Sequence, residues 1–216
     1  MTLPADLPIF PLTGNLLLPG GLLPLHIFEP RYRNMVEDAL DSHEHIGMIQ
    51  PKTPNRADNR GEGGEEEVID LYEIGCAGVI EQHQSLPFGR YLIVLRGICR
   101  FRAKQELPVE RGYRRVEADY ESFLVDLRED EEPIKAQPLL DALQHFSLER
   151  GVEIELDRLS DVPPVALLNG LAMSLPLAPV EKQALLEAEN VVARQAMLLA
   201  LLEMGIAADE TPTLTH

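Results

Sequence analysis

Short apolar runs separated by prolines and glycines fill the first 126 residues, and many of them alternate with polar positions. Such alternation is typical of strands that bury one face. One stretch differs, because Glu29-Pro30 precedes apolar residues spaced three and four apart, which predicts a helix that begins near Pro30. The predicted strands cover residues 7–12, 22–28, 68–73, 75–82, 90–104 and 116–120.

The remainder of the chain follows the period of a helix. Apolar spacing predicts three helices, over about residues 137–150, 164–175 and 179–204. The acidic segment 126–133 is predicted to be a linker. The pattern therefore predicts an α+β protein with a β-rich part over residues 1–126 and a helical part over residues 127–216.

The predicted strand over residues 90–104 places two kinds of side chain on opposite faces. Its odd positions are mostly apolar, whereas its even positions hold a basic ladder, which we define as Arg90, Arg96, Arg100, Arg102 and Lys104. Residues 127–216 carry 16 acidic and six basic side chains. The basic ladder therefore either contacts an acidic ligand or polypeptide, or packs against the acidic helical part, and we favour the second interpretation.

Composition narrows the classes of partner. The chain has 36 acidic and 19 basic residues and a formal net charge of -17, which disfavours nucleic acid and anionic membranes as partners of the whole protein. Two cysteines are too few for a disulfide framework. The chain shows no apolar run long enough to span a membrane and no secretory signal, so a cytoplasmic protein is expected. Residues 51–67 are predicted to form a polar, low-complexity loop.

Recognisable catalytic frames are missing from the sequence. It contains no phosphate-binding glycine loop and no G-x-S-x-G turn, and we predict no cofactor. Cys76 and Cys99 lie in strand-like runs, where small buried thiols are the expected role. His43 and His45 lie near carboxylates but lack a metal-binding spacing, so we interpret them as part of a polar helix end and predict no metal.

Several segments resemble one family. The proline-rich opening Leu7–Leu12, followed by residues 23–32 with Glu-Pro-Arg-Tyr at their end, is similar to the opening of the Lon protease N-terminal domain. Residues 74–80, 89–91 and 94–101 are similar to its later strands, and residues 181–187 with Arg194 to its helical part. The resemblance covers about nine tenths of the chain.

The resemblance implies a PUA-like mixed β pseudobarrel followed by a C-terminal α-helical bundle. In full-length Lon this region engages substrate polypeptides and precedes an ATPase and a Ser–Lys protease. This sequence carries neither of those modules, so the resemblance implies a stand-alone, non-catalytic module. Its expected partner is unfolded or misfolded polypeptide, with an adaptor role as one form of that function, and its oligomeric state is left open.

Four residues are predicted for polypeptide binding: Phe28, Arg31, Tyr32 and Phe88. Phe28, Tyr32 and Phe88 would line an apolar surface, with Phe88 exposed at a hairpin tip. Arg31 is more simply interpreted as a structural clamp to a carboxylate such as Glu29. Two alternatives remain. The basic ladder could bind RNA or a nucleotide, because PUA-like folds often bind RNA, and the region of His43 and His45 could serve a small-molecule or metal-dependent enzyme.

Overall fold

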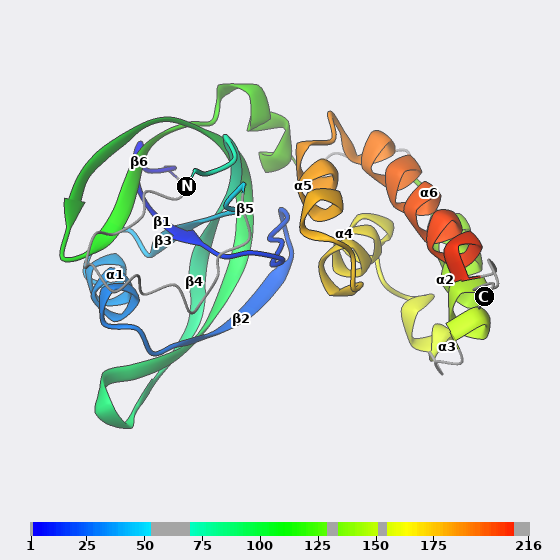
Figure 1. Cartoon of the computed structure of the whole chain (residues 1–216), viewed down its shortest axis with the longest axis horizontal. Coiled ribbons are helices and arrows are strands. Elements are labelled where there is room, and N and C mark those ends of the chain that lie inside the picture. Colours follow the sequence, from blue (N-terminus) through cyan, green and yellow to red (C-terminus); the bar gives the residue numbers. More distant parts are fainter. Residues whose placement is uncertain (1, 53–69, 129–133, 151–154, 210–216) are drawn as a thin grey trace, which may run out of the picture. The chain divides into compact units, whose positions relative to one another are not determined.

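The computed structural model describes residues 2–52, 70–128, 134–150 and 155–209. The chain divides into two compact units, Met1–Arg128 and Glu129–His216, which we describe separately. The predicted α+β class is confirmed, with a mixed β sheet in the first unit and helices in the second (Figure 1).

The described residues of the first unit form six strands. They are β1 (Asp6–Pro11), β2 (Leu22–Ile27), β3 (His45–Ile49), β4 (Ile74–Leu86), β5 (Arg90–Glu110) and β6 (Tyr113–Asp119). Their order is β2-β5-β4-β3-β1-β6, and a further pairing of β5 with β6 closes a barrel that leaves β2 outside the ring. Among these described strands, only the β1–β3 pair is parallel. A cluster of apolar side chains forms one core of the barrel: Leu7, Ile9, Ile49, Ala77, Phe101, Val116 and Ala118.

Helix α1 (Pro30–Leu40) begins as the sequence predicts, with proline at its first turn. It buries Tyr32, Met35, Val36 and Ala39, the face that the 3–4 spacing indicates. The predicted helix end around His43 and His45 is wrong, because α1 ends at Leu40 and β3 begins at His45. All five residues of β3 are buried, so this strand has no polar alternation that the sequence could reveal.

A buried arm crosses the barrel between β1 and β2. Leu16, Leu17 and Leu18 are buried without belonging to a strand. Where the arm ends, the Gly20 N–H donates to the carbonyl of Gly97, and the Gly97 N–H donates to that of Gly21, both at 2.9 Å. The arm is thus fixed to the middle of β5.

Two other predictions about this unit need correction. The strand predicted over residues 68–73 begins outside the described residues, and from Asp70 to Glu73 the chain forms one isolated bridge, between Leu71 and Pro51, before β4 starts. The alternation predicted for β5 fails from Gly97 to Phe101, where five successive residues are buried. The reason is η2 (Glu121–Leu127), a 3₁₀ segment that packs on β5. Residues 53–67 of the predicted polar loop also lie outside the described residues.

Helices α2 (Ala136–Arg150), α3 (Leu156–Leu159), α4 (Pro164–Ser174), α5 (Pro179–Glu187) and α6 (Val191–Asp209) make up the second unit. The predicted first and second helices agree with α2 and α4 to within about one residue. The single helix predicted from 179 to 204 is instead two. Asn190 starts α6, because its side-chain oxygen accepts a hydrogen bond from the Ala193 N–H at 2.9 Å, as an N-cap does.

Candidate functional site

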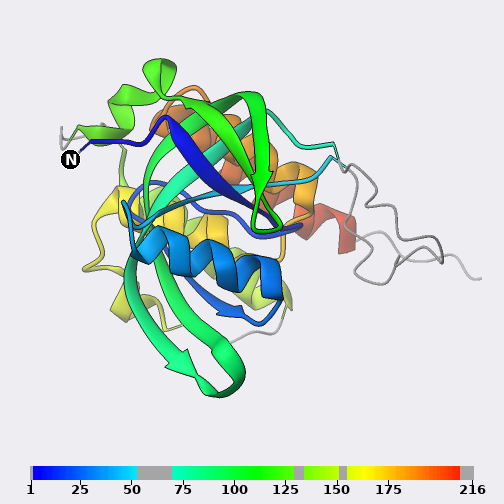
Figure 2. The same cartoon turned by 90° about the vertical axis from the view of Figure 1, so that its left-hand side faces the viewer.

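The β4–β5 hairpin reaches beyond the barrel and ends in a short turn, η1 (Pro87–Gly89) (Figures 1 and 2). Residues 81–85 of β4 are all exposed. At the tip, Phe88 has 87% of its surface exposed and a backbone φ of 66°. The Arg33 Nη1 of α1 donates a hydrogen bond to the Phe88 carbonyl at 2.7 Å, which holds the tip to the helix. The hairpin therefore presents an aromatic ring to solvent from an anchored backbone.

A second exposed apolar strip runs along β2. Phe28, directly after this strand, is 60% exposed, and Leu22 at its start is 56% exposed. Across the pairing with β5, His26 lies opposite Leu92, which is 43% exposed. A groove of about 620 Å³ opens beside them, lined in part by Pro24, His26, Gln82, Gln84, Leu92 and Val94. Neither the strip nor the lining of the groove contains Lys, Arg, Asp or Glu.

Two of the predicted binding residues have structural roles instead. Tyr32 is buried, with its ring centroid 4.2 Å from that of Phe10, so it does not offer its ring to a ligand. Arg31 pairs with Glu29 at 3.0 Å and lies over the Tyr32 ring. The exposed candidates that remain are Phe28 and Phe88, which the Ile27–Tyr91 pairing places at the same end of the barrel unit.

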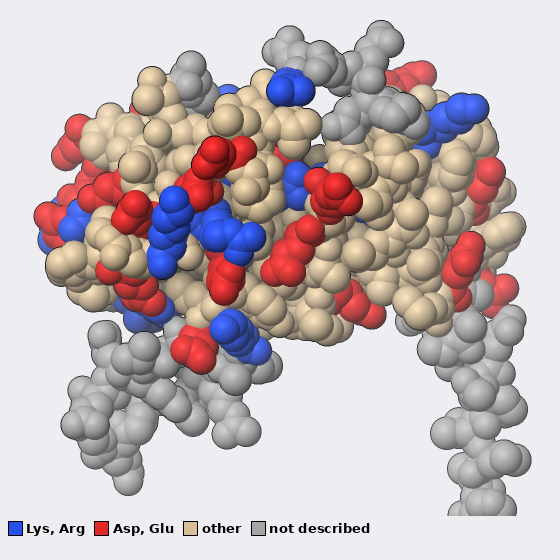
Figure 3. All heavy atoms as spheres, turned by 90° about the horizontal axis from the view of Figure 1, so that it is seen from above, with Lys and Arg blue, Asp and Glu red and all other residues tan. Residues whose placement is uncertain are grey.

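Four of the five residues of the basic ladder pair with carboxylates of the barrel unit, and the fifth, Arg90, is bonded to a backbone carbonyl. Arg96 pairs with Glu81 at 3.3 Å, Arg102 with Glu73 at 2.5 Å and Lys104 with Asp119 at 3.0 Å. Arg100 is buried against Asp126, and Arg90 donates to the Pro87 carbonyl at 3.2 Å. On the face drawn in Figure 3, basic and acidic side chains lie next to one another rather than in separate patches.

These ladder pairings change two predictions. The neutralising carboxylates come from the barrel unit itself, not from the helical part that we favoured. The alternative of RNA or nucleotide binding loses support, because it requires cations that phosphates can reach without competing carboxylates. Asp126, predicted to open a linker, is instead a buried partner of β5, with 8% of its side chain exposed.

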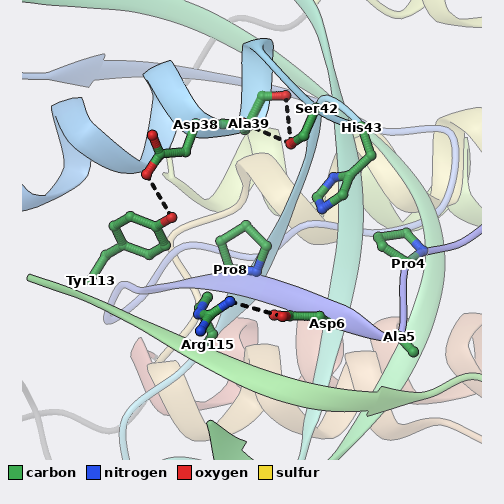
Figure 4. A pocket seen from close by; sticks show the side chains of 10 residues that line it. All are labelled: Pro4, Ala5, Asp6, Pro8, Asp38, Ala39, Ser42, His43, Tyr113 and Arg115. Atoms are coloured by element: carbon green, nitrogen blue, oxygen red, sulfur yellow. Dashed lines mark hydrogen bonds and ion pairs between the residues drawn. The ribbon is translucent and has the colours of Figure 1, made fainter. Parts of the chain in front are cut away.

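A pocket of about 400 Å³ lies between β1, β6 and the end of α1 (Figure 4). Its polar groups are already engaged with one another. The Tyr113 hydroxyl donates to Asp38 at 2.8 Å, Arg115 pairs with Asp6 at 2.8 Å, and the Ser42 hydroxyl donates to the Asp38 carbonyl at 2.7 Å. Burial, followed by the hydrogen bond to Asp38, raises the pKa of Tyr113. The pocket thus offers few polar groups that a substrate could recruit.

His43 lines this pocket and contacts His45. Burial and then the neighbouring His45 lower the pKa of His43 below its usual 6.5. The His45 backbone N–H donates to the His43 Nδ1 at 3.1 Å, a bond that the protonated ring cannot accept. Among the described residues, no group of three or more His, Cys, Asp or Glu side chains could hold a metal ion.

This histidine gives a pH dependence that can be measured. Because the folded-state pKa of His43 lies below 6.5, the unfolded chain takes up this proton first as the pH falls. The contribution of His43 to stability is therefore full above pH 6.5 and declines below it. We expect urea unfolding at pH 7.5 and 5.5 to show a larger loss of stability for the wild type than for His43→Gln. Equal losses would contradict this role.

The two thiols are unsuited to nucleophilic chemistry. Cys76 and Cys99 are both buried. Burial, followed by the charge of Asp126, raises the pKa of Cys99 to about 12. A thiol with such a pKa is almost fully protonated at neutral pH and is a poor nucleophile.

The family-like residues of the second unit connect its helices. Glu181 accepts a hydrogen bond from the Ala178 N–H at 2.7 Å at the start of α5. Lys182 donates to the Met173 carbonyl at 3.1 Å, and burial lowers its pKa. Arg194 is buried and donates to the Leu185 carbonyl at 3.0 Å and to Asn169 at 3.1 Å. These side chains hold α4, α5 and α6 together. No described helix is long and apolar enough to cross a membrane.

Comparisons with solved structures agree with this fold. The Lon N-terminal domain protein from Xanthomonas campestris matches with a TM-score of 0.59 and 23% identity, over 90% of this chain and 97% of that one. The N-terminal domain of a Mycobacterium avium complex Lon protease matches with a TM-score of 0.54 and 19% identity, over 95% of this chain and all of that one.

Sequence comparisons point the same way. Lon protease 2 of Myxococcus xanthus is 28% identical over 212 residues, and Lon protease of Escherichia coli K12 is 26% identical over 208 residues. Each alignment covers 93% of this chain, which spans about a quarter of the length of these proteases. A model of the substrate-binding domain of the ATP-dependent protease La (LON) matches residues 6–204. The chain therefore belongs to the LON substrate-binding domain family.

Proposed function

We propose that this chain binds polypeptide segments that expose apolar side chains, and that the β4–β5 hairpin tip and the strip along β2 make the contact. The match to a substrate-binding domain supports a binding role. We further propose that the chain catalyses no reaction itself and acts as an adaptor for unfolded or misfolded protein. A cytoplasmic location stays a prediction from the sequence.

The observation that carries this proposal is the conformation and exposure of Phe88. The left-handed backbone conformation costs a residue with a Cβ about 1 kcal/mol relative to the ordinary right-handed regions. Glycine and asparagine therefore usually occupy it. Phe88 adopts this conformation with φ of 66° while leaving most of its ring in water. A glycine or asparagine could form the same turn and the same backbone hydrogen bond from Arg33 without these two costs. Unfavourable backbone conformations of this kind concentrate at functional sites, which supports a contact role for the ring.

Removing the ring should weaken binding and strengthen the fold. In Phe88→Asn the left-handed backbone becomes easier to adopt, so we expect a small rise in melting temperature. The same variant should bind fluorescein-labelled unfolded peptides about tenfold or more weakly, because exposed aromatic anchors dominate such contacts. Fluorescence anisotropy and thermal unfolding measure the two effects. Phe88→Asp should weaken binding at least as much.

Val109→Asn is the matched control. Val109 is also an exposed apolar residue of β5, but it lies at the far end of that strand from the hairpin tip. We expect this variant to bind peptides as the wild type does. If Phe88→Asn binds normally, or if the wild type binds no member of a diverse peptide array, the proposal does not hold.

A further inference from the structure

Strand β2 has one edge without a partner. It pairs with β5 along residues 22–27, and within the described part of the chain no other strand lies beside it. The backbone hydrogen bonds found outside the regular strands also involve none of these six residues. The outer edge of β2 therefore presents backbone groups that no described residue satisfies.

The register identifies these groups. The Gly97 N–H donates to the Gly21 carbonyl. Because hydrogen-bonded and non-bonded positions alternate along an antiparallel pair, Leu23, Leu25 and Ile27 make the next backbone hydrogen bonds with β5. The residues between them, Leu22, Pro24 and His26, direct their backbone outward. Pro24 agrees with this assignment, since it has no N–H to give to β5. The free edge thus offers three carbonyls and two N–H groups.

This edge lacks the usual protection against strand pairing. Natural edge strands are often shielded by charged side chains, bulges or covering loops. The six residues of β2, LLPLHI, include no Lys, Arg, Asp or Glu. Pro24 is the one blocking residue among them, and it removes a single donor. The edge therefore has no charged side chain to pair with a charge on an added strand, which favours uncharged segments.

We propose that an extended, uncharged segment of a bound polypeptide adds to β2 as a further strand. An open row of N–H and carbonyl groups is satisfied most fully by another extended backbone, whatever its side chains. This inference rests on the proposed function and gives it a mode of recognition that reads backbone rather than sequence. Long apolar or aromatic side chains of the added strand would reach the groove beside Pro24, His26 and Leu92.

Two substitutions test this mode from opposite directions. His26→Pro removes one outward N–H without touching a bond to β5, and it should weaken binding about three- to tenfold. Pro24→Ala adds the missing N–H and should strengthen binding by a similar factor. His26→Ala is the matched control for the first variant, because it removes the ring but keeps the backbone donor. Circular dichroism and thermal unfolding establish that each variant folds.

The peptide backbone provides a test that leaves the protein unchanged. The probe is a fluorescein-labelled ten-residue peptide of Val, Leu, Thr and Ser, made in two versions that carry N-methyl groups at alternate positions or at every position. An added strand uses only one of its edges, so the alternately methylated peptide should bind nearly as the parent does through its open edge, whereas the fully methylated peptide should lose binding at least tenfold. Equal effects of the two versions, or unchanged binding by both proline variants, would overturn strand addition.

The outcomes separate this inference from the proposed function. If Phe88→Asn weakens peptide binding but the His26 and Pro24 variants do not change it, the binding function stands and strand addition fails. If the wild type binds no peptide, both fail. A second copy of the chain could instead occupy the edge. Light scattering that shows dimers, dissociated by His26→Pro in the absence of peptide, would count against a polypeptide ligand at this edge.

Discussion

Gly97→Ala is expected to lower the free energy of unfolding by about 3 kcal/mol, the upper part of the range for an overpacked core. A Cβ at this position would lie 2.1 Å from the Leu18 carbonyl oxygen. That carbonyl cannot simply move away, because buried leucines and two backbone hydrogen bonds hold the arm against β5. The arm or the strand must therefore shift, and one or both of those bonds must lengthen. Urea unfolding at neutral pH measures the loss.

Gly170→Ala is the matched control for this substitution. Gly170 lies in α4, and a Cβ built there meets nothing within 4 Å. Since alanine is favoured over glycine inside a helix, this variant should gain about 0.5–1 kcal/mol. A loss of less than about 1 kcal/mol for Gly97→Ala would show that the arm yields easily, and the close approach would then have little importance for the fold.

The second large effect is expected at the ion pair between Arg100 and Asp126. Arg100 has only 2% of its side chain exposed and its Cζ lies 4.9 Å from the centre of the Phe123 ring. Its Nε and Nη2 donate to the two oxygens of Asp126, and its backbone N–H donates as well, all at 2.9 Å. Arg100→Met leaves a buried carboxylate without its cation, which should cost about 3–5 kcal/mol.

Two comparisons show whether burial is the cause. The double variant Arg100→Met with Asp126→Leu removes both charges and should recover most of the loss, as replacements of whole buried pairs do. Arg102→Met breaks an exposed pair with Glu73 two residues along β5 and should cost no more than about 1 kcal/mol. If Arg102→Met is as damaging as Arg100→Met, burial does not explain the effect.

The sequence predicts correctly those elements in which the spacing of apolar residues shows which face is buried. Helix α1 is an example, because Tyr32, Met35, Val36 and Ala39 repeat at helical spacing and all face the barrel. Helices α2 and α4 follow the same rule. Among candidate residues, the exposure of Phe88 follows from its place in a turn. In each case the local pattern and the tertiary structure require the same residues.

The parts that were missed depend on neighbours far away in the sequence. Arg100 looks solvent-exposed in an alternating strand, but η2 covers it and supplies Asp126. The break between α5 and α6 is an exception, because it has a local signal: Asn190 is a preferred N-cap residue, and its side chain accepts a hydrogen bond from the Ala193 N–H. The free edge of β2 cannot be predicted from the sequence of the strand itself. The pattern of apolar residues in a strand is the same whether one or both of its edges are paired.

The closure of the barrel has a consequence for how the chain is made. The ion pair between Arg115 and Asp6 joins residues 109 positions apart, and β1 pairs with β6 through this same region. At 5–20 residues per second, a ribosome needs roughly 5–20 s to deliver β6 after β1 has emerged. During that interval β1 lacks one of its two neighbouring strands, so the nascent first half itself resembles the unfolded segments that we propose this protein binds.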